Sequence, residues 1–85
     1  MAIRVLYFAW VRERIGTGEE LVDPPADVNT VSALIDWLIT RSAGHALALG
    51  ERGRLRAAVD QAFVPLDAPL GEAREVAIFP PVTGG

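Results

Sequence analysis

The chain opens with an alternating run of side chains over residues 3–9, IRVLYFA. Because successive side chains of an extended strand point to opposite faces, one face carries Ile3, Val5 and Tyr7. The other face also becomes apolar toward the end of the run, where Phe8 lies. This pattern predicts a central strand whose second face is covered as well.

A second alternating run, REVAIF over residues 74–79, predicts the last strand of the chain. Its apolarity matches that of the first strand, so we expect the two to lie side by side at the middle of one sheet. Three shorter runs predict further strands, at residues 19–23, 55–60 and 62–66. A tight turn near Gln61 is expected to join the last two, and Pro65 marks the final one as an edge strand or a strand end.

A period of 3.6 residues replaces the alternation in the middle of the chain and predicts one main helix over residues 30–43. Its apolar stripe consists of Val31, Leu34, Ile35, Leu38 and Ile39. Asn29 or Thr30 suits the N-cap, and Gly44 suits the C-terminal stop. Residues 45–53, HALALGERG, are expected to form a loop or a short helical turn.

These elements predict a two-layer α+β architecture, because one amphipathic helix can cover one face of a mixed sheet of four to five strands. With the first and last strands at the centre, this is the ubiquitin-like β-grasp fold. We therefore expect one β-grasp domain over residues 1–79 and an extended C-terminal tail over residues 80–85.

Composition narrows the classes of function. The 85 residues are 51% hydrophobic, yet no apolar run approaches the roughly 18 residues that span a bilayer. The N-terminal stretch also lacks the cleavage site of a secretory signal, so we expect a cytoplasmic protein with no membrane partner. The net charge is −3 and the eight basic residues are scattered arginines, which argues against a nucleic-acid partner.

The side chains offer little catalytic chemistry. The chain has no cysteine, which excludes disulfides, cysteine metal sites and a thiol nucleophile. His45 is expected to have a surface or capping role, because no nucleophile with an orienting third group can be assigned to it. The carboxylates show no metal-ligand spacing, so we predict no metal site. The chain also has no lysine, and it therefore offers no side-chain amine that could receive an isopeptide bond.

We interpret the final run, FPPVTGG, as a functional segment. Pro80 and Pro81 hold an extended path, while Gly84 and Gly85 are slim enough to enter a narrow site. Measured from Phe79, the tail can reach roughly 20 Å beyond the sheet. We expect it to carry its terminal carboxylate into a pocket of another protein. A frayed end and a truncated chain are the alternative explanations.

Two segments connect this pattern to a known family. VLYFAWVRERIG near the start and AVDQAFVPLDAPLGEAREVAIFPPVTGG at the end resemble the small, sulfur-carrying subunit of molybdopterin synthase, the MoaD family, and the resemblance covers nearly the whole chain. It implies that a separate activating enzyme uses ATP to adenylate the carboxylate of Gly85, which then becomes a thiocarboxylate. It implies further that the sulfur passes to cyclic pyranopterin monophosphate, with no cofactor bound permanently to this chain.

The resemblance also implies partners and contact residues. The large synthase subunit is expected to supply the catalytic side chains, in an assembly of two small and two large subunits. Phe8, Phe63 and Phe79 are predicted to form an apolar patch on the sheet face away from the helix, where this partner docks. The tail residues expected to contact its binding tunnel are Pro80, Pro81, Val82, Thr83 and Gly84.

One residue departs from the family pattern. Asp60 stands where many members carry Asn before the Gln, which questions any hydrogen bond that relies on an amide there. Two other functions stay open: a ubiquitin-like module for binding or for conjugation to lysines of target proteins, and the sulfur carrier of thiamine biosynthesis. The chain length and the double proline favour the molybdopterin carrier.

Overall fold

The computed structural model describes residues 2–81 of the chain. The strands in this range are β1 (Ile3–Tyr7), β2 (Glu19–Val22), β3 (Arg56–Val59), β4 (Ala62–Val64) and β5 (Glu75–Phe79). The helices are α1 (Ala9–Ile15), α2 (Val31–Ile39) and α3 (Ala43–Leu49), and a 3-10 turn follows at Arg52–Arg54. No helix within residues 2–81 is long and apolar enough to cross a membrane.

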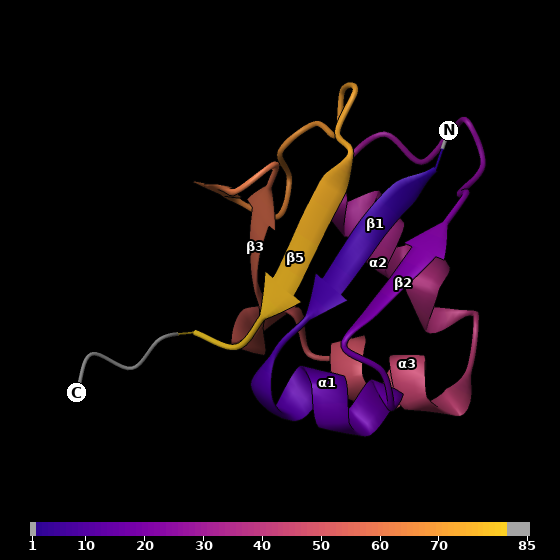
Figure 1. The fold of residues 1–85 in the computed structure, drawn as a ribbon, viewed down its shortest axis with the longest axis vertical. Coiled ribbons are helices and arrows are strands. Elements are labelled where there is room, and N and C mark those ends of the chain that lie inside the picture. Colours follow the sequence, from indigo (N-terminus) through magenta and orange to yellow (C-terminus); the bar gives the residue numbers. More distant parts are fainter. Residues whose placement is uncertain (1, 82–85) are drawn as a thin grey trace.

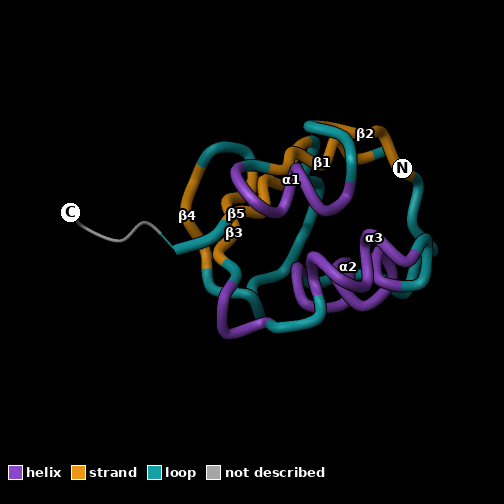
Figure 2. The backbone as a smooth tube through the Cα atoms, turned by 90° about the horizontal axis from the view of Figure 1, so that it is seen from below, coloured by secondary structure: helices purple, strands orange, loops and turns teal. Residues whose placement is uncertain are grey.

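The strands form one mixed sheet in the order β2-β1-β5-β3-β4, with β1 and β5 adjacent near its centre (Figure 1). These two strands run parallel and pair Val5 with Val76, whereas the other strand pairs are antiparallel. Seen along the strands, α2 and α3 lie on one side of the sheet (Figure 2). The predicted α+β β-grasp fold is confirmed, including the neighbouring positions of the first and last strands.

The core lies between the sheet and α2, as the apolar stripe predicts. The fully buried side chains of α2 are Val31, Leu34, Ile35 and Leu38. The facing layer from β1 and β5 consists of Val5, Tyr7, Val76 and Ile78. Ile39 and Trp37 are partly buried and pack at the margin of this core. Because burial of one such aliphatic side chain stabilises the fold by about 1.5–3 kcal/mol, packing on the sheet holds α2 in place.

The main helix is shorter than predicted. Of the two candidate N-caps, Thr30 is the one that acts, since its Oγ1 accepts a backbone N–H of the first turn at 3.0 Å. At the other end the helix stops at Ile39, because Thr40 and Arg41 donate their N–H groups to carbonyls three residues back. These bonds tighten the last turn and close the helix. The prediction of one helix over residues 30–43 is therefore wrong beyond Ile39.

A separate helix, α3, begins where the sequence predicted a helix stop followed by a loop or a short helical turn. The Oγ of Ser42 caps it by accepting the N–H of His45 at 3.1 Å. Gly44, the predicted stop, lies instead in the first turn of α3. A Cβ atom there would lie 2.8 Å from the carbonyl oxygen of Arg14, so the glycine permits the close approach of α3 to α1. This packing constraint, and not helix termination, explains the glycine.

We expect Gly44→Ala to lower the free energy of unfolding by about 1–3 kcal/mol, because the added methyl group overpacks the contact between α1 and α3. Gly53→Ala is the matched control, since a Cβ at Gly53 meets no atom within 4 Å. Urea unfolding followed by circular dichroism measures both variants. Equal unfolding free energies for the two would contradict this role of Gly44.

Candidate functional site

Three phenylalanine rings gather on the outer face of the sheet, and we call Phe8, Phe63 and Phe79 the aromatic patch. The rings of Phe8 and Phe79 lie 6.5 Å apart in an edge arrangement, and those of Phe63 and Phe79 lie 5.8 Å apart. Phe63 is 82% exposed and Phe8 is 49% exposed, while Phe79 between them is half-buried. An exposed aromatic cluster of this kind is typical of a protein interface, although its role here stays a prediction.

The register of the sheet explains why the rings meet. β1 and β5 are parallel and in step up to their last residues, so Phe8 and Phe79 emerge next to each other. Phe63 lies on the edge strand β4, and its partner in β3 is Ala58. Because Ala58 has only a methyl group, it does not separate the rings of Phe63 and Phe79. The patch therefore spans the sheet from β1 to β4.

The tail begins directly at this patch. Pro80 and Pro81 follow Phe79, are half-buried, and border a shallow hollow together with Trp10 and Arg54. The chain thus leaves the sheet from the end of the interior strand β5 (Figure 1). The other predicted tail residues lie outside the described residues, and these are Val82, Thr83, Gly84 and Gly85.

His45 is buried, which corrects the prediction of a surface role. Its Nε2 lies 2.6 Å from Oε2 of Glu20, and its Nδ1 lies 2.7 Å from Oγ of Ser42. The hydroxyl of Tyr7 donates to the same Glu20 oxygen at 2.7 Å, and Arg41 lies 3.6 Å from the other one. We call these five residues the polar cluster. It connects β1 and β2 with α3 on the core side of the sheet.

The polar cluster keeps Glu20 ionised. Burial alone would raise the pKa of its carboxyl group, but hydrogen bonds from His45 and Tyr7 and the charges of His45 and Arg41 outweigh burial and lower that pKa below 4.5. Burial, with the Glu20 carboxylate second, raises the pKa of the Tyr7 hydroxyl above its usual range. Ser42 touches His45, but its Oγ also caps α3, so we assign the cluster a structural role.

Asp60 forms hydrogen bonds to the start of β5 without a side-chain amide. It lies in the turn between β3 and β4 with a left-handed φ of 48°, followed by Gln61 with 72°, which confirms the tight turn predicted there. Its Oδ1 accepts the N–H groups of Arg74 and Glu75, each at 3.0 Å. Asn carries the same carbonyl-type acceptor, so these bonds need only an oxygen. Asp60, in place of the Asn of many family members, therefore still forms both hydrogen bonds.

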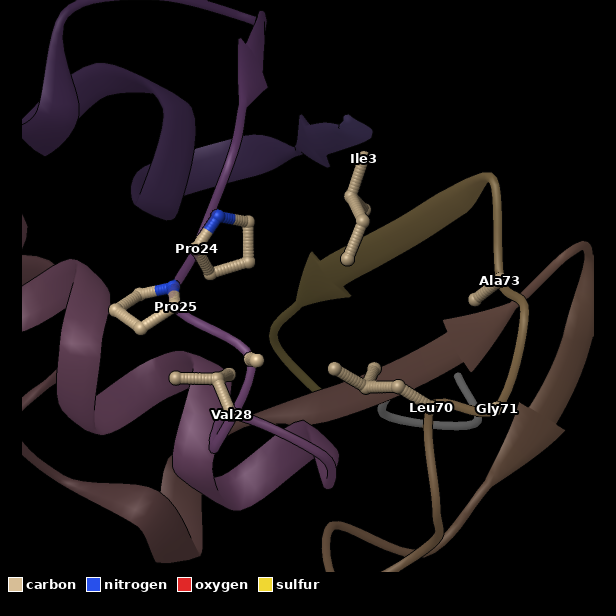
Figure 3. Close-up of a pocket in the computed structure, with 8 residues that line it drawn as sticks. Ile3, Pro24, Pro25, Val28, Leu70, Gly71 and Ala73 are labelled. Atoms are coloured by element: carbon tan, nitrogen blue, oxygen red, sulfur yellow. The ribbon is translucent and has the colours of Figure 1, made fainter. Parts of the chain in front are cut away.

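The hollow at the other end of the sheet is lined by no catalytic or metal-binding side chain among the described residues. It lies beside the start of β1, and its lining residues are Ile3, Pro24, Pro25, Ala26, Val28, Leu70, Gly71 and Ala73 (Figure 3). None of these side chains can ionise, donate a hydrogen bond or bind a metal ion. Within residues 2–81, no group of three or more His, Cys, Asp or Glu side chains could hold a metal ion either. The aromatic patch and the start of the tail are therefore the candidate site.

Comparison with known proteins identifies the family of the chain. A sequence model of the ThiS family matches residues 5–85. The chain belongs to the ThiS family. A curated relative from Escherichia coli (strain K12), a molybdopterin synthase sulfur carrier subunit, is 51% identical over 83 residues, covering 98% of this chain and 99% of the relative. A sulfur carrier subunit of the same description from Haemophilus influenzae is 39% identical over 83 residues, with the same 98% and 99% coverage.

A solved structure supports the same relationship. A protein from Pyrococcus furiosus, assigned as molybdopterin converting factor subunit 1, superposes with a TM-score of 0.77 at 28% identity. The match covers 96% of this chain and 99% of that chain. The resemblance to molybdopterin synthase sulfur carriers, found from the two sequence segments, is thus confirmed.

Sequence reasoning missed the polar cluster, although β2 contains a signal for it. Glu20 alternates with the exposed Leu21 and so shares a face with the buried Val22. An acidic side chain on such a face needs a charged or hydrogen-bonding partner. His45 is that partner, but it lies 25 residues away along the chain, so the pairing becomes evident only once the position of α3 is known.

The polar cluster predicts an acid-sensitive fold. Because the pKa of Glu20 is lower in the folded chain than its ordinary 4.5, its stabilisation is present above that value and is lost as the pH falls through the folded pKa. Glu20→Gln should therefore lose less stability than the wild type when the pH drops below 4.5. At neutral pH we expect this variant to be about 1–3 kcal/mol less stable, because its partners are left poorly satisfied.

The measurement is urea unfolding at a series of pH values, with Glu72→Gln as the control. Glu72 is exposed, and its substitution removes the same formal charge. Parallel acid limbs for the wild type and Glu20→Gln would contradict the assigned role of Glu20.

Proposed function

We propose that this chain is the sulfur carrier subunit of a molybdopterin synthase. The observation that carries the proposal is the junction of the aromatic patch with a tail that leaves an interior strand and runs through two prolines toward Gly85. The relatives with 51% and 39% identity, both described as molybdopterin synthase sulfur carrier subunits, support it. The rest of the domain then acts as a rigid platform for the tail.

In the proposed cycle Gly85 is the only reacting residue of this chain. Its carboxylate attacks the α-phosphate of ATP on an activating enzyme, and pyrophosphate leaves. Sulfur at the oxidation level of hydrosulfide then attacks the acyl carbon of the adenylate, AMP leaves, and a thiocarboxylate remains on Gly85. The sulfur of this thiocarboxylate bonds to a carbon of cyclic pyranopterin monophosphate, and water then cleaves the acyl–sulfur bond, which leaves the sulfur on the pterin and returns the carboxylate of Gly85. A chain without cysteine has no side-chain thiol that could carry the sulfur instead.

The division of work between subunits follows from what the described residues offer. The aromatic patch provides apolar area for docking, and Pro80 and Pro81 restrict the backbone where the chain leaves β5. The residues that we propose to contact the partner's tunnel are Pro80, Pro81, Val82, Thr83 and Gly84. The catalytic side chains are then those of the large subunit, in an assembly of two small and two large chains in the cytoplasm.

The two alternatives receive less support. A carrier of thiamine biosynthesis would share the tail chemistry, but both curated relatives reported above are molybdopterin synthase subunits. A conjugation module would join Gly85 to lysines of target proteins by amide bonds. The products formed on Gly85 distinguish this alternative from a sulfur carrier.

Docking depends on Phe63 if the proposal is right. Phe63→Glu places a charge at the most exposed ring of the aromatic patch, and we expect the affinity for the cognate large subunit to fall at least about thirtyfold, as at an interface hot spot. Leu21→Glu is the matched control, because Leu21 is 70% exposed at the opposite edge of the sheet. Calorimetric titration measures both. Undiminished binding of Phe63→Glu, with unfolding unchanged, would reject the patch as the docking surface.

The chemistry is tested on the intact chain. After incubation with ATP, the cognate activating enzyme and a sulfur source, we expect mass spectrometry to show replacement of one oxygen by sulfur in the C-terminal peptide. A variant with one alanine added after Gly85 should never acquire sulfur at Gly85, because its carboxyl group lies in a peptide bond. Sulfur found elsewhere would contradict the carrier function, and amide bonds to lysines of other proteins would indicate conjugation.

A further inference from the structure

Two arginines lie over the ring of one tryptophan beside the start of the tail. The guanidinium carbon of Arg14 lies 4.6 Å from the centroid of the Trp10 ring, and that of Arg54 lies 5.0 Å from it. Because both distances refer to one ring, the two guanidinium carbons are no farther apart than about 10 Å. That separation is about one Debye length at moderate salt, so the two charges act on a partner together.

Neither arginine forms an ion pair within the described part of the chain. Ion pairs among residues 2–81 connect Arg4 with Glu19, both Arg41 and His45 with Glu20, and Arg52 with Asp36. Arg14 and Arg54 take part in none of them, and both are exposed. In a chain of net charge −3 they form a local positive site beside the ring of Trp10. We call Trp10, Arg14 and Arg54 the arginine platform.

The free N–H groups of the two arginines favour carboxylates as ligands. Both guanidinium groups are exposed and take part in none of the side-chain hydrogen bonds or ion pairs within residues 2–81, so their N–H groups stay available. Those N–H groups match the two oxygens of a carboxylate in a bidentate contact. Arg14 comes from α1 and Arg54 from the 3-10 turn, so the ring holds donors from two separate elements in one place.

The platform is continuous with the proposed docking surface. Trp10 and Arg54 border the same hollow as Pro80 and Pro81, and Phe8 precedes Trp10 by two residues. A specific interface covers about 800 Å² on each partner. Phenylalanine side chains offer about 150–250 Å² each when fully exposed, and Phe8 and Phe79 are half-buried. A partner that covers the patch and receives the tail must therefore extend beyond the three rings.

We propose that the arginine platform binds carboxylate side chains of the protein that receives the tail. This inference rests on the proposed function, which identifies that protein as the large synthase subunit. The aromatic patch supplies the apolar contact, and the platform accelerates the approach of an acidic surface and fixes the direction in which the tail enters. Complementary charge acts mainly on the association rate, so the effect is kinetic and salt-dependent.

The test compares association rates of the full chain with the purified cognate large subunit, by stopped flow, at about 0.05 to 0.5 M NaCl. The double variant Arg14→Gln, Arg54→Gln is expected to associate about tenfold more slowly at low salt and to approach the wild type at high salt. The control is Arg4→Gln, Arg74→Gln, which removes equal charge at the opposite end of β1 and β5. This control variant is expected to associate less than threefold more slowly than the wild type at low salt. Unfolding midpoints of all variants verify folding.

The outcomes separate this inference from the function on which it rests. If the wild type binds and the platform variant associates at the same rate with the same salt dependence, the inference is wrong and the proposed function stands. If both double variants are slowed equally, net charge explains the effect and the platform is not a site. If the wild type does not bind the large subunit, the proposed function fails and the inference fails with it.

Discussion

The parallel pairing of β1 with β5 is the constraint on which the rest of the molecule depends. Parallel neighbours require a long crossover, and residues between Phe8 and Arg74 provide it while forming the helical layer and the three other strands. The same pairing puts the last strand in the interior of the sheet, where both of its edges are hydrogen-bonded. A tail that leaves from there starts at a fixed point. Phe79, the last residue of β5, meets Phe8, which follows β1.

Packing of α3 against α1 also fixes the position of α1. The polar cluster attaches α3 to β2 through His45 and Glu20, and the cap of Ser42 sets where α3 begins. α3 then meets α1 at Gly44, where the backbone of one helix approaches the carbonyl of Arg14. Because α1 bears Trp10 and Arg14 and follows Phe8 directly, the hydrogen-bonded pair of His45 and Glu20 on the core side of the sheet contributes to the position of groups beside the tail. This pair also orients α3 relative to β2.

The sequence predicted what depends on local pattern and could not predict what depends on contact between distant segments. Alternation in β1 and β5 and the stripe of α2 gave the sheet centre, the core and the fold, because both periods follow from local backbone geometry. The aromatic patch was also predictable, since strand order alone brings Phe8 and Phe79 together. The break between α2 and α3 was not, because Thr40 and Ser42 compete with the helix through local hydrogen bonds that helical period does not encode. Likewise, the glycine in α3 and the burial of His45 are explained only by α1 and β2.

A carrier that binds two proteins in turn must dissociate quickly from each of them. This requirement limits how large its apolar docking surface can be. On the proposed function, the aromatic patch and the tail meet first an activating enzyme and then the large subunit, and each complex must dissociate before the next forms. Enlarging the apolar contact would tighten both complexes chiefly by slowing dissociation, which would lower the rate of the cycle. Exposed charges next to the patch raise the association rate with little effect on dissociation. A small aromatic patch flanked by two arginines over the Trp10 ring is therefore better suited to rapid exchange than a larger apolar surface would be.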